Sequence, residues 1–460
     1  MEFRDLDELR HHAVGVLDLG EPVRIQDQDA LTTRFIEPLV RTAIFADDVL
    51  LRDVARYLIQ EIAACRGVRS ASIQPLYDAR GRGDVQGFTV PAMNIRGLTY
   101  DTARAAFRAA RKHRVGALVF EIARSEIDYT QQRPAEFAAA VTAAAIREGF
   151  QGPLFLQGDH FQINALSYAK DRDAELQAVK DLIEEAVQAR FLNIDIDTST
   201  LVDLSLSTVK KQQQLNYTLA AELTAVVRKE QPADTCISVG GEIGEVGKKN
   251  STVEELEAYM DGFMEELHQH GDLQGPSKIS VQTGTSHGGV PLPDGGVAEA
   301  HVDFEVLRQL SQVASERYGM AGAVQHGAST LPQDAFHHFP RIETAEIHLA
   351  TGFQNLTLDH PEFPDDLRRE VRDFCFDNLA AERKEDWTDA QFLYKTRKKA
   401  FGPLKRKMWD LPSSVRDAIG ATLEEQFALL FQELAVVDSD TMVQGLVVPQ
   451  TLPSSRPAGL

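Results

Sequence analysis

The sequence lacks the features that define several large classes of protein. Its 460 residues contain only three cysteines, Cys65, Cys236 and Cys375, and these form no Cys-x-x-Cys pair. This argues against a disulfide framework or a thiolate zinc site and fits a reducing compartment. No apolar run reaches the roughly 18 residues that a membrane-spanning helix needs, and the polar, acidic N-terminus has no signal-peptide pattern. We therefore predict a cytoplasmic location.

The sequence also has fewer positively than negatively charged residues. The chain has 48 Lys and Arg against 69 Asp and Glu, which gives a formal net charge of −21. Such a surface disfavours nucleic acid and anionic membranes, so we expect neither as a partner. A small phosphorylated substrate remains compatible, because it needs only a local basic pocket. Residues 394–409 concentrate seven Lys or Arg, either as a solvated face or as a phosphate-binding or subunit-contact element.

Short apolar runs alternate with longer amphipathic stretches from about residue 86 onward. Because neighbouring parallel strands need crossover connections, this alternation predicts parallel strands separated by helices. Eight such units fit a closed (β/α)8 TIM barrel better than an open sheet, and no Gly-x-Gly-x-x-Gly motif supports a dinucleotide-binding fold. The expected strands lie in residues 88–94, 116–123, 152–158, 191–197, 235–241, 277–284, 322–327 and 345–351.

The chain is expected to have three parts. Residues 86–385 form the barrel, residues 1–85 an N-terminal helical extension, and residues 386–460 a C-terminal helical extension and tail. The first extension contains a helical pattern at 47–67 but no motif that indicates chemistry. We expect it to pack against a larger body or a second subunit.

Polar residues follow several of the expected strands. In a (β/α)8 barrel, the carboxyl ends of the strands meet at one face and carry the active site. His160, Glu242, His287 and His326 come from four different strand ends and are candidate ligands for Zn²⁺ or another divalent metal. Asp159 directly precedes His160 and is a candidate acid–base group. Further polar residues at or near strand ends are Asn94, Asp195, His348 and Thr351.

Glycine-rich segments surround the candidate ligands. They are GGEIGEVG at 240–247, GTSHGG at 284–289 and QHGAST at 325–330. Glycine lets backbone N–H groups approach an anion closely, and small hydroxyls add further donors. This pattern suits a phosphate group or an array of sugar hydroxyls.

Together these stretches resemble the class II, metal-dependent ketose-bisphosphate aldolases, including fructose- and tagatose-bisphosphate aldolases. The resemblance extends over roughly residues 87–355, with the motifs in the family's order. The motifs that carry it are FTVPAMN, QGDH, NIDID, GGEIGEVG, GTSHGG, HGAST and IHLAT.

The resemblance implies a reversible cleavage of a ketose 1,6-bisphosphate, with fructose 1,6-bisphosphate as the expected substrate. The products would be dihydroxyacetone phosphate and glyceraldehyde 3-phosphate, formed through a zinc-stabilised enediolate. It also implies a place in glycolysis and gluconeogenesis, a phosphorylated sugar as the partner, and assembly as a homodimer or homotetramer.

The resemblance also assigns roles to single residues. His160, His287 and His326 would bind zinc, with Glu242 as a fourth or alternating ligand. Asp159 would exchange a proton with the C4 hydroxyl of the substrate. The expected substrate contacts are the phosphate-binding Gly288, Gly327, Ser329 and Thr351, together with His348. Asn94 and Asp195 would touch substrate or order the ligands.

The sequence departs from the family pattern in three places. His348 stands where the family has asparagine, and Ala123 where it has a phosphate-binding serine, with Arg124 and Ser125 following. The loop after Glu242 has lysine, Lys249 being nearest, where a proton-transferring glutamate is expected. Glu245 and Glu254 lie close by in the sequence.

Two alternatives remain open. A ketose 4-epimerase could cleave, rotate and rejoin the fragments on the same metal site. The stretches at 120–134 and 158–164 also resemble the non-catalytic partner subunit of tagatose-bisphosphate aldolase. A scaffold has no need of a complete ligand set, which argues against the second alternative.

Overall fold

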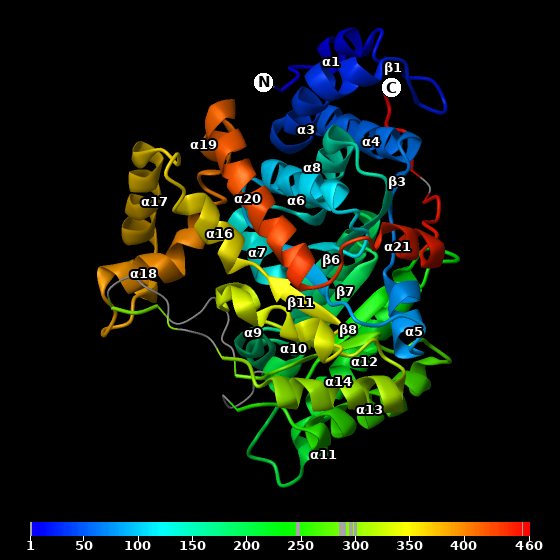
Figure 1. Ribbon diagram of the computed structural model, residues 1–460, viewed down its shortest axis with the longest axis vertical. Coiled ribbons are helices and arrows are strands. Elements are labelled where there is room, and N and C mark those ends of the chain that lie inside the picture. The colour runs from blue at the N-terminus through cyan, green and yellow to red at the C-terminus, as the bar shows by residue number, and fades with distance from the viewer. Residues whose placement is uncertain (1, 245–248, 285–290, 294–297, 299–300, 453) are drawn as a thin grey trace.

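The computed structural model describes residues 2–244, 249–284, 291–293, 298, 301–452 and 454–460. The barrel strands are β4 (Val90–Asn94), β5 (Val119–Ala123), β6 (Gly152–Gln162), β7 (Asn193–Asp197), β8 (Ser238–Glu242), β9 (Lys278–Val281), β10 (Ala323–Gln325) and β11 (Glu346–Leu349). They run parallel in the order β6-β5-β4-β11-β10-β9-β8-β7, and pairing of β6 with β7 closes the barrel. Figure 1 shows β6, β7, β8 and β11 in the middle of the molecule, with helices around them. Each strand overlaps one of the expected runs, so the predicted (β/α)8 fold is confirmed.

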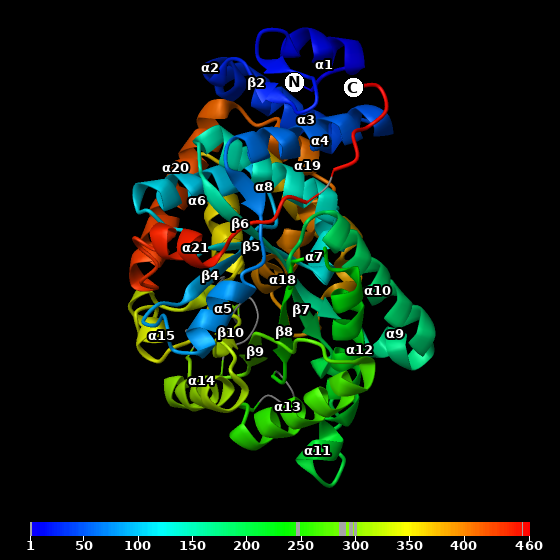
Figure 2. The ribbon, with the colours of Figure 1, turned by 90° about the vertical axis from the view of Figure 1, so that its right-hand side faces the viewer.

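Helices fill the connections and surround the strands (Figure 2). Local sequence sets their ends: α8 begins at Pro134, where no N–H is needed, and ends at Gly149, whose φ of 68° lies in the left-handed region. The helices between barrel strands and after the last one are α6 (Thr99–Lys112), α7 (Arg124–Thr130), α8 (Pro134–Glu148), α9 (Ala165–Lys170), α10 (Arg172–Gln188), α11 (Val209–Gln212), α12 (Gln214–Glu230), α13 (Val253–Leu267), α14 (Phe304–Tyr318), α15 (His338–Arg341) and α16 (Thr351–Leu358).

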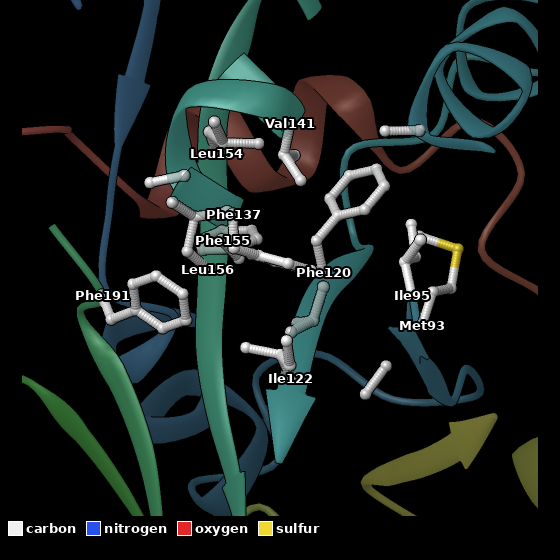
Figure 3. Packing of buried hydrophobic residues seen from close by; sticks show 14 of the residues in the cluster. Met93, Ile95, Phe120, Ile122, Phe137, Val141, Leu154, Phe155, Leu156 and Phe191 are labelled. Atoms are coloured by element: carbon white, nitrogen blue, oxygen red, sulfur yellow. The ribbon is translucent and has the colours of Figure 1, made fainter. Parts of the chain in front are cut away.

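The hydrophobic core lies between the strands and the helices. Phe107 of α6 and Phe120 of β5 have ring centroids 4.8 Å apart, and Phe137 of α8 lies 5.9 Å from Phe191. Figure 3 shows Phe120, Phe137 and Phe191 together with Phe155 of β6, all of them fully buried. Because each ring removes on the order of 150–250 Å² from water, this layer holds the helices against the barrel.

The N-terminal segment extends and covers the barrel. Its strand β3 (Val68–Ser70) pairs in parallel with the start of β6, with Val68 opposite Gly152. Helix α5 (Gln74–Gly81) covers the N-terminal mouth, where Arg80 donates to the carbonyl oxygens of Ala321 and Thr344 just before two strands begin. The earlier elements are α1 (Leu6–Ala13), β1 (Leu17–Asp18), β2 (Arg24–Ile25), α2 (Gln28–Ala30), α3 (Ile36–Phe45) and α4 (Val49–Cys65).

The C-terminal segment packs on the outer helices and on the loops of the barrel. Helix α20 (Ser413–Glu433) lies along α6, where Arg416 donates to Asp101 at 3.1 Å. The ring of Phe401 lies against Gly97, in the connection from β4 to α6. The other elements are α17 (Asp365–Asn378), α18 (Asp389–Thr396), the 3-10 turn η7 (Arg397–Ala400), α19 (Lys405–Trp409) and α21 (Asp440–Leu446).

The two ends of the chain lie side by side. Arg456 donates to the carbonyl oxygen of Leu19 at 2.6 Å, and Figures 1 and 2 show both termini at the same end of the molecule. Within the described residues, no helix combines the length and the apolar character needed to cross a membrane. The domain boundaries expected at residues 85 and 385 remain predictions.

Replacing Gly97 by alanine tests the contact between the C-terminal segment and the barrel. The added Cβ would lie 2.1 Å from the ring of Phe401, so we expect the free energy of unfolding to fall by about 1–3 kcal/mol in chemical denaturation. Gly445→Ala, where the new Cβ meets no atom within 4 Å, is the control and should be neutral or slightly stabilising. Equal denaturation midpoints for the two variants would contradict the close packing.

Candidate functional site

A cavity of about 500 Å³ opens at the carboxyl end of the barrel. It brings together strand-end residues that are separated by more than 250 positions in the chain. The predicted site residues that line it are Asn94, Asp159, His160, His326, Gly327, Ser329, His348 and Thr351. Two other predicted residues, His287 and Gly288, lie outside the described part of the chain.

Asp159 and His160 are neighbours in sequence, yet both side chains line the cavity. In a regular strand, consecutive side chains point to opposite faces. Here the pairing of β6 with β7 shifts register between Gly158 and Phe161, and His160 has a left-handed φ of 40°. This bulge turns both side chains toward the site. Gly158 makes room for it, because a Cβ there would lie 2.4 Å from the ring of Phe161.

The rings of His160 and His326 face each other in the cavity. Nε2 of His160 lies 3.1 Å from Nδ1 of His326. The other nitrogen of each ring has partners of its own: Nδ1 of His160 lies 3.0 Å from Oδ2 of Asp197 and 3.1 Å from Oε2 of Glu242, and Nε2 of His326 lies 2.8 Å from Oγ of Ser280. Partners of this kind orient metal-binding histidines and fix which nitrogen is left to bind.

This donor set fits a divalent metal such as zinc. Two nitrogens bound to a tetrahedral zinc at about 2.0–2.1 Å lie roughly 3.3 Å apart, which is close to the separation of the facing nitrogens. Glu242 adds a carboxylate, and ligand atoms of His160, Glu242 and His326 all lie within 4.8 Å of one another. Three of the four predicted ligands therefore meet; the fourth is His287, outside the described residues.

Carboxylates determine the charge of His160. Burial by itself lowers the pKa of this imidazole, but the charges of Asp159 and Glu242 and the hydrogen bond to Asp197 outweigh burial and raise the pKa well above its usual value. Burial raises the pKa of Asp197, but the hydrogen bond from His160 outweighs it, so the pKa is lowered. Protonation of this ring therefore competes with metal binding, because a ligating histidine must be neutral.

His348, near the end of β11, lies among four carboxylates, of which Asp195 is the most distant at 3.7 Å from Nε2. Its Nδ1 is 3.2 Å from both Oδ1 of Asp159 and Oε1 of Glu121, and its Nε2 is 2.7 Å from Oε1 of Glu346. Burial opposes the charged form, but Glu121 and Asp159 raise the pKa of His348 well above its usual value. Burial and the charge of Asp159 raise the pKa of Glu121 to about 7. The imidazole thus keeps these carboxylates together at the cavity floor.

One layer deeper, the barrel interior is polar. Lys278 is 1% exposed, and its Nζ donates to Asp195 at 3.0 Å, to Gln157 at 2.8 Å and to Glu346. Burial by itself lowers the pKa of Lys278, but the charges of Asp195 and Glu346 raise it above its usual value. Tyr77 of α5 donates to Glu346 from the N-terminal mouth. This layer supports the cavity floor from below.

The sequence analysis missed most of this layer. Asp195 is predicted to touch substrate or order the ligands, and the structure places it beneath the cavity, paired with Lys278. A signal was present, because Glu121 and Glu346 each stand in an otherwise largely apolar run and Lys278 is a charged residue within an expected strand. Glu346 also shares the alternation of β11 with His348, which places both on the inner face.

The rim of the cavity carries hydroxyls and cations. Oγ of Ser329 accepts a backbone N–H at 2.6 Å, and Gly327 has a left-handed φ of 67°. Oγ1 of Thr351 accepts from Arg96 at 3.2 Å. The sequence analysis did not single out Arg96, which is held by Glu126 at 2.6 Å. The rim therefore offers groups that can bind an anion.

Ala123 borders the cavity at the position where a serine is expected, with Arg124 and Ser125 beside it. Arg124 forms an ion pair with Glu175 at 2.5 Å. This pair fixes the guanidinium at the rim. Arg124 and Ser125 are therefore close enough to supply donors that Ala123 lacks.

In its described part, the loop after Glu242 offers no carboxylate in place of the expected proton-transferring glutamate. Lys249 forms an ion pair with Glu255 at 2.8 Å. Glu254 is exposed at the start of α13. Glu245 lies outside the described residues. The departure from the family pattern at this loop therefore persists in the described structure.

The chain is similar to known aldolases. Residues 81–414 match the family model for class II fructose-bisphosphate aldolase, and no curated protein matches the chain. A structure from Sinorhizobium meliloti 1021, described as a probable tagatose 6 phosphate kinase, is 18% identical and aligns with a TM-score of 0.52 over 79% of this chain and 95% of its own. At that identity it supports the barrel fold alone.

Two further solved structures cover similar shares of the chain. The YdjI aldolase from Escherichia coli K12 is 12% identical over 81% of this chain and 99% of its own, with a TM-score of 0.47. The fructose-bisphosphate aldolase (Fba) from Campylobacter jejuni is 16% identical over 81% of this chain and 96% of its own, with a TM-score of 0.48.

Replacing Lys278 by methionine tests the polar layer. Loss of the ammonium leaves Asp195 and Glu346 buried without a counter-charge, which should lower the free energy of unfolding by about 3–5 kcal/mol. Lys210→Met is the control, because Lys210 and Glu265 form an exposed pair and its loss should barely move the denaturation midpoint. If both variants unfold at the same denaturant concentration, the layer does not stabilise the barrel.

Proposed function

The chain belongs to the class II fructose-bisphosphate aldolase family, and we propose that it is a metal-dependent aldolase acting on a ketose 1,6-bisphosphate. The proposed substrate is fructose 1,6-bisphosphate, cleaved reversibly to dihydroxyacetone phosphate and glyceraldehyde 3-phosphate. One observation carries this proposal: the facing nitrogens of His160 and His326 lie beside the carboxylate of Asp159. A metal ligand set and a general base in one cavity are the groups that carbon–carbon cleavage next to a carbonyl requires.

The metal would be held by His160, Glu242 and His326, with His287 as a further ligand. We propose zinc, because imidazole and carboxylate donors suit this borderline ion. When bound, it would supply Lewis-acid polarisation of the ketose carbonyl and stabilise the charge left by cleavage. The contacts to Asp197 and Ser280 keep the two imidazoles oriented toward this position.

Asp159 is the group that we propose for proton transfer. Its carboxylate is 5% exposed and lies 3.2 Å from Nδ1 of His348 and 3.4 Å from the amide nitrogen of Asn94. We propose that it takes the proton of the C4 hydroxyl while the C3–C4 bond breaks. The electron pair of that bond stays on the dihydroxyacetone phosphate half as an enediolate, the other half leaves as the aldehyde, and a proton taken up from water at C3 of the enediolate completes dihydroxyacetone phosphate. Condensation returns the proton by the same path.

The glycines and hydroxyls at the rim would hold the substrate. Ser329 and Thr351, with the backbone at Gly327, would bind a phosphate of the dihydroxyacetone phosphate half, as would Gly288. Asn94 contacts the catalytic carboxylate from the side and would touch the sugar hydroxyls. The supporting observation is that the described members of this group line one cavity.

The cellular setting is part of the same proposal. We propose a cytoplasmic enzyme of glycolysis and gluconeogenesis that assembles as a homodimer or homotetramer. Its partner is a phosphorylated sugar rather than a nucleic acid or a membrane. The three cysteines are free thiols, which accords with a reducing compartment.

A ketose 4-epimerase is the second candidate. It is favoured by His348, which contacts Asp159 and gives the cavity a second proton carrier, and by the loop where Lys249 pairs with Glu255. Cleavage, rotation of the aldehyde and rejoining would invert C4 without release of fragments. A non-catalytic partner subunit is the third candidate, and it would require a second polypeptide before any turnover.

Activity should appear with the purified, zinc-loaded chain alone. We expect fructose 1,6-bisphosphate to yield triose phosphate in a coupled assay, and a chelator to abolish the signal until zinc is restored. Incubation with free fructose or tagatose, followed by sugar chromatography, tests the epimerase. Absence of chelator-sensitive triose phosphate release would contradict the aldolase, and turnover only after addition of a second polypeptide would favour the partner subunit.

Two variants should separate metal binding from proton transfer. His160→Ala removes a ligand, so we expect loss of both bound metal and activity. Asp159→Asn keeps the shape but removes the base, so it should retain metal while kcat falls by roughly 10²–10⁴-fold. Metal content by mass spectrometry and steady-state kinetics measure both effects. Full turnover by Asp159→Asn would rule out its proposed role.

A further inference from the structure

The basic stretch at residues 394–409 consists largely of structural ion pairs. Its seven cations lie along α18, η7 and α19. Five of them pair with carboxylates on neighbouring elements: Arg397 with Asp359, Lys399 with Glu382, Lys405 with Glu136, Arg406 with Glu2, and Lys407 with Glu370. These five tie the C-terminal segment to the rest of the molecule.

Lys398 differs from these five. It is one of the residues that line the barrel cavity, although it is on η7 of the C-terminal segment. Within the described part of the chain, its ammonium forms no hydrogen bond or ion pair, and its Nζ lies 5.5 Å from the centroid of the Tyr129 ring. Burying a cation costs free energy unless an anion lies beside it. Because Lys398 forms no ion pair with a carboxylate of the described residues, a bound anion would offset this cost.

The backbone around Lys398 is held tightly in place. A Cβ on Gly97 would lie 2.1 Å from the ring of Phe401, and a Cβ on Gly402 would lie 2.4 Å from the carbonyl oxygen of Tyr129. Arg397, the preceding residue, is fixed to Asp359. The position of Lys398 at the cavity is therefore set by packing on both sides.

A second cation lies close to Lys398. Burial, together with the charge of Arg96, lowers the pKa of Lys398 to about 8. Glu126, whose charge acts the other way, is already bonded to Arg96 and to the backbone N–H of Ala123. Arg96 in turn donates to Thr351 at the cavity rim. Two cations and a hydroxyl thus meet on one side of the cavity.

We propose that Lys398 binds an oxyanion of the substrate, a phosphate or a carboxylate group, in this cavity beside Arg96 and Thr351. An oxyanion would give the ammonium of Lys398 a direct anionic partner, and it would accept charge-assisted hydrogen bonds from Lys398 and Arg96. The C-terminal segment thereby completes the substrate site from within the same chain. The identity of the substrate rests on the proposed function. The proposal that Lys398 binds an anion does not.

Titration calorimetry of the full-length, zinc-loaded protein tests this directly. The probes are inorganic phosphate and glucuronate, which separate a phosphate from a carboxylate site. We expect Lys398→Met to raise the Kd of one probe by about 10-fold or more, and Lys398→Arg to restore most of the affinity. Lys399→Met is the matched control, because Lys399 is the next residue, pairs with Glu382 and does not line the cavity; its Kd should stay within about twofold.

The outcomes separate this inference from the proposed function. If the wild-type protein binds neither probe, or if Lys398→Met binds both as well as the wild type does, the inference is overturned. If one probe depends on Lys398 but no triose phosphate is released from fructose 1,6-bisphosphate, the anion site stands and the proposed reaction fails. If the protein is active, Lys398→Met should also raise KM for fructose 1,6-bisphosphate more than it lowers kcat, and thermal unfolding of each variant verifies the fold.

Discussion

The left-handed backbone at His160 is the constraint on which the rest of the site depends. A regular strand would send either Asp159 or His160 outward into the helical layer, because consecutive side chains alternate. The bulge in β6 turns both inward, so that one brings a carboxylate to the cavity and the other a nitrogen that faces His326. Gly158 and Phe161 make the bulge possible, since the ring of Phe161 lies where a larger residue at 158 would place its Cβ. The packing of Phe161 against Gly158 therefore sets the positions of the two side chains on which the site depends.

Buried charge links the two mouths of the barrel. Glu346 is bonded to Tyr77 of α5, to Lys278 in the interior and to His348 at the cavity floor. His348 in turn contacts Asp159. Each carboxylate in this chain of contacts has a cation or a hydroxyl beside it, which offsets the cost of its burial. A segment that precedes the barrel in sequence is thus connected by these contacts to the carboxylate of Asp159 at the opposite mouth.

The two extensions have comparable roles at opposite ends. The N-terminal segment adds β3 to β6 and closes the lower mouth with α5. The C-terminal segment packs through Phe401 on Gly97 and brings Lys398 to the cavity. Both are attached by close contacts and ion pairs rather than by a flexible linker. The cavity is consequently formed by the barrel together with a segment that begins after its last strand.

The sequence by itself determined the barrel and the convergence of His160, Glu242 and His326. Alternating apolar runs and helices require parallel strands, and parallel strands bring their carboxyl ends to one face. Only the tertiary structure decided which charged side chains lie next to one another. Lys278 pairs with Asp195, and Lys398 reaches the cavity from the C-terminal segment. The reason is physical. Periodicity reports the environment of one strand or helix, whereas ion pairs between distant segments depend on how those segments pack.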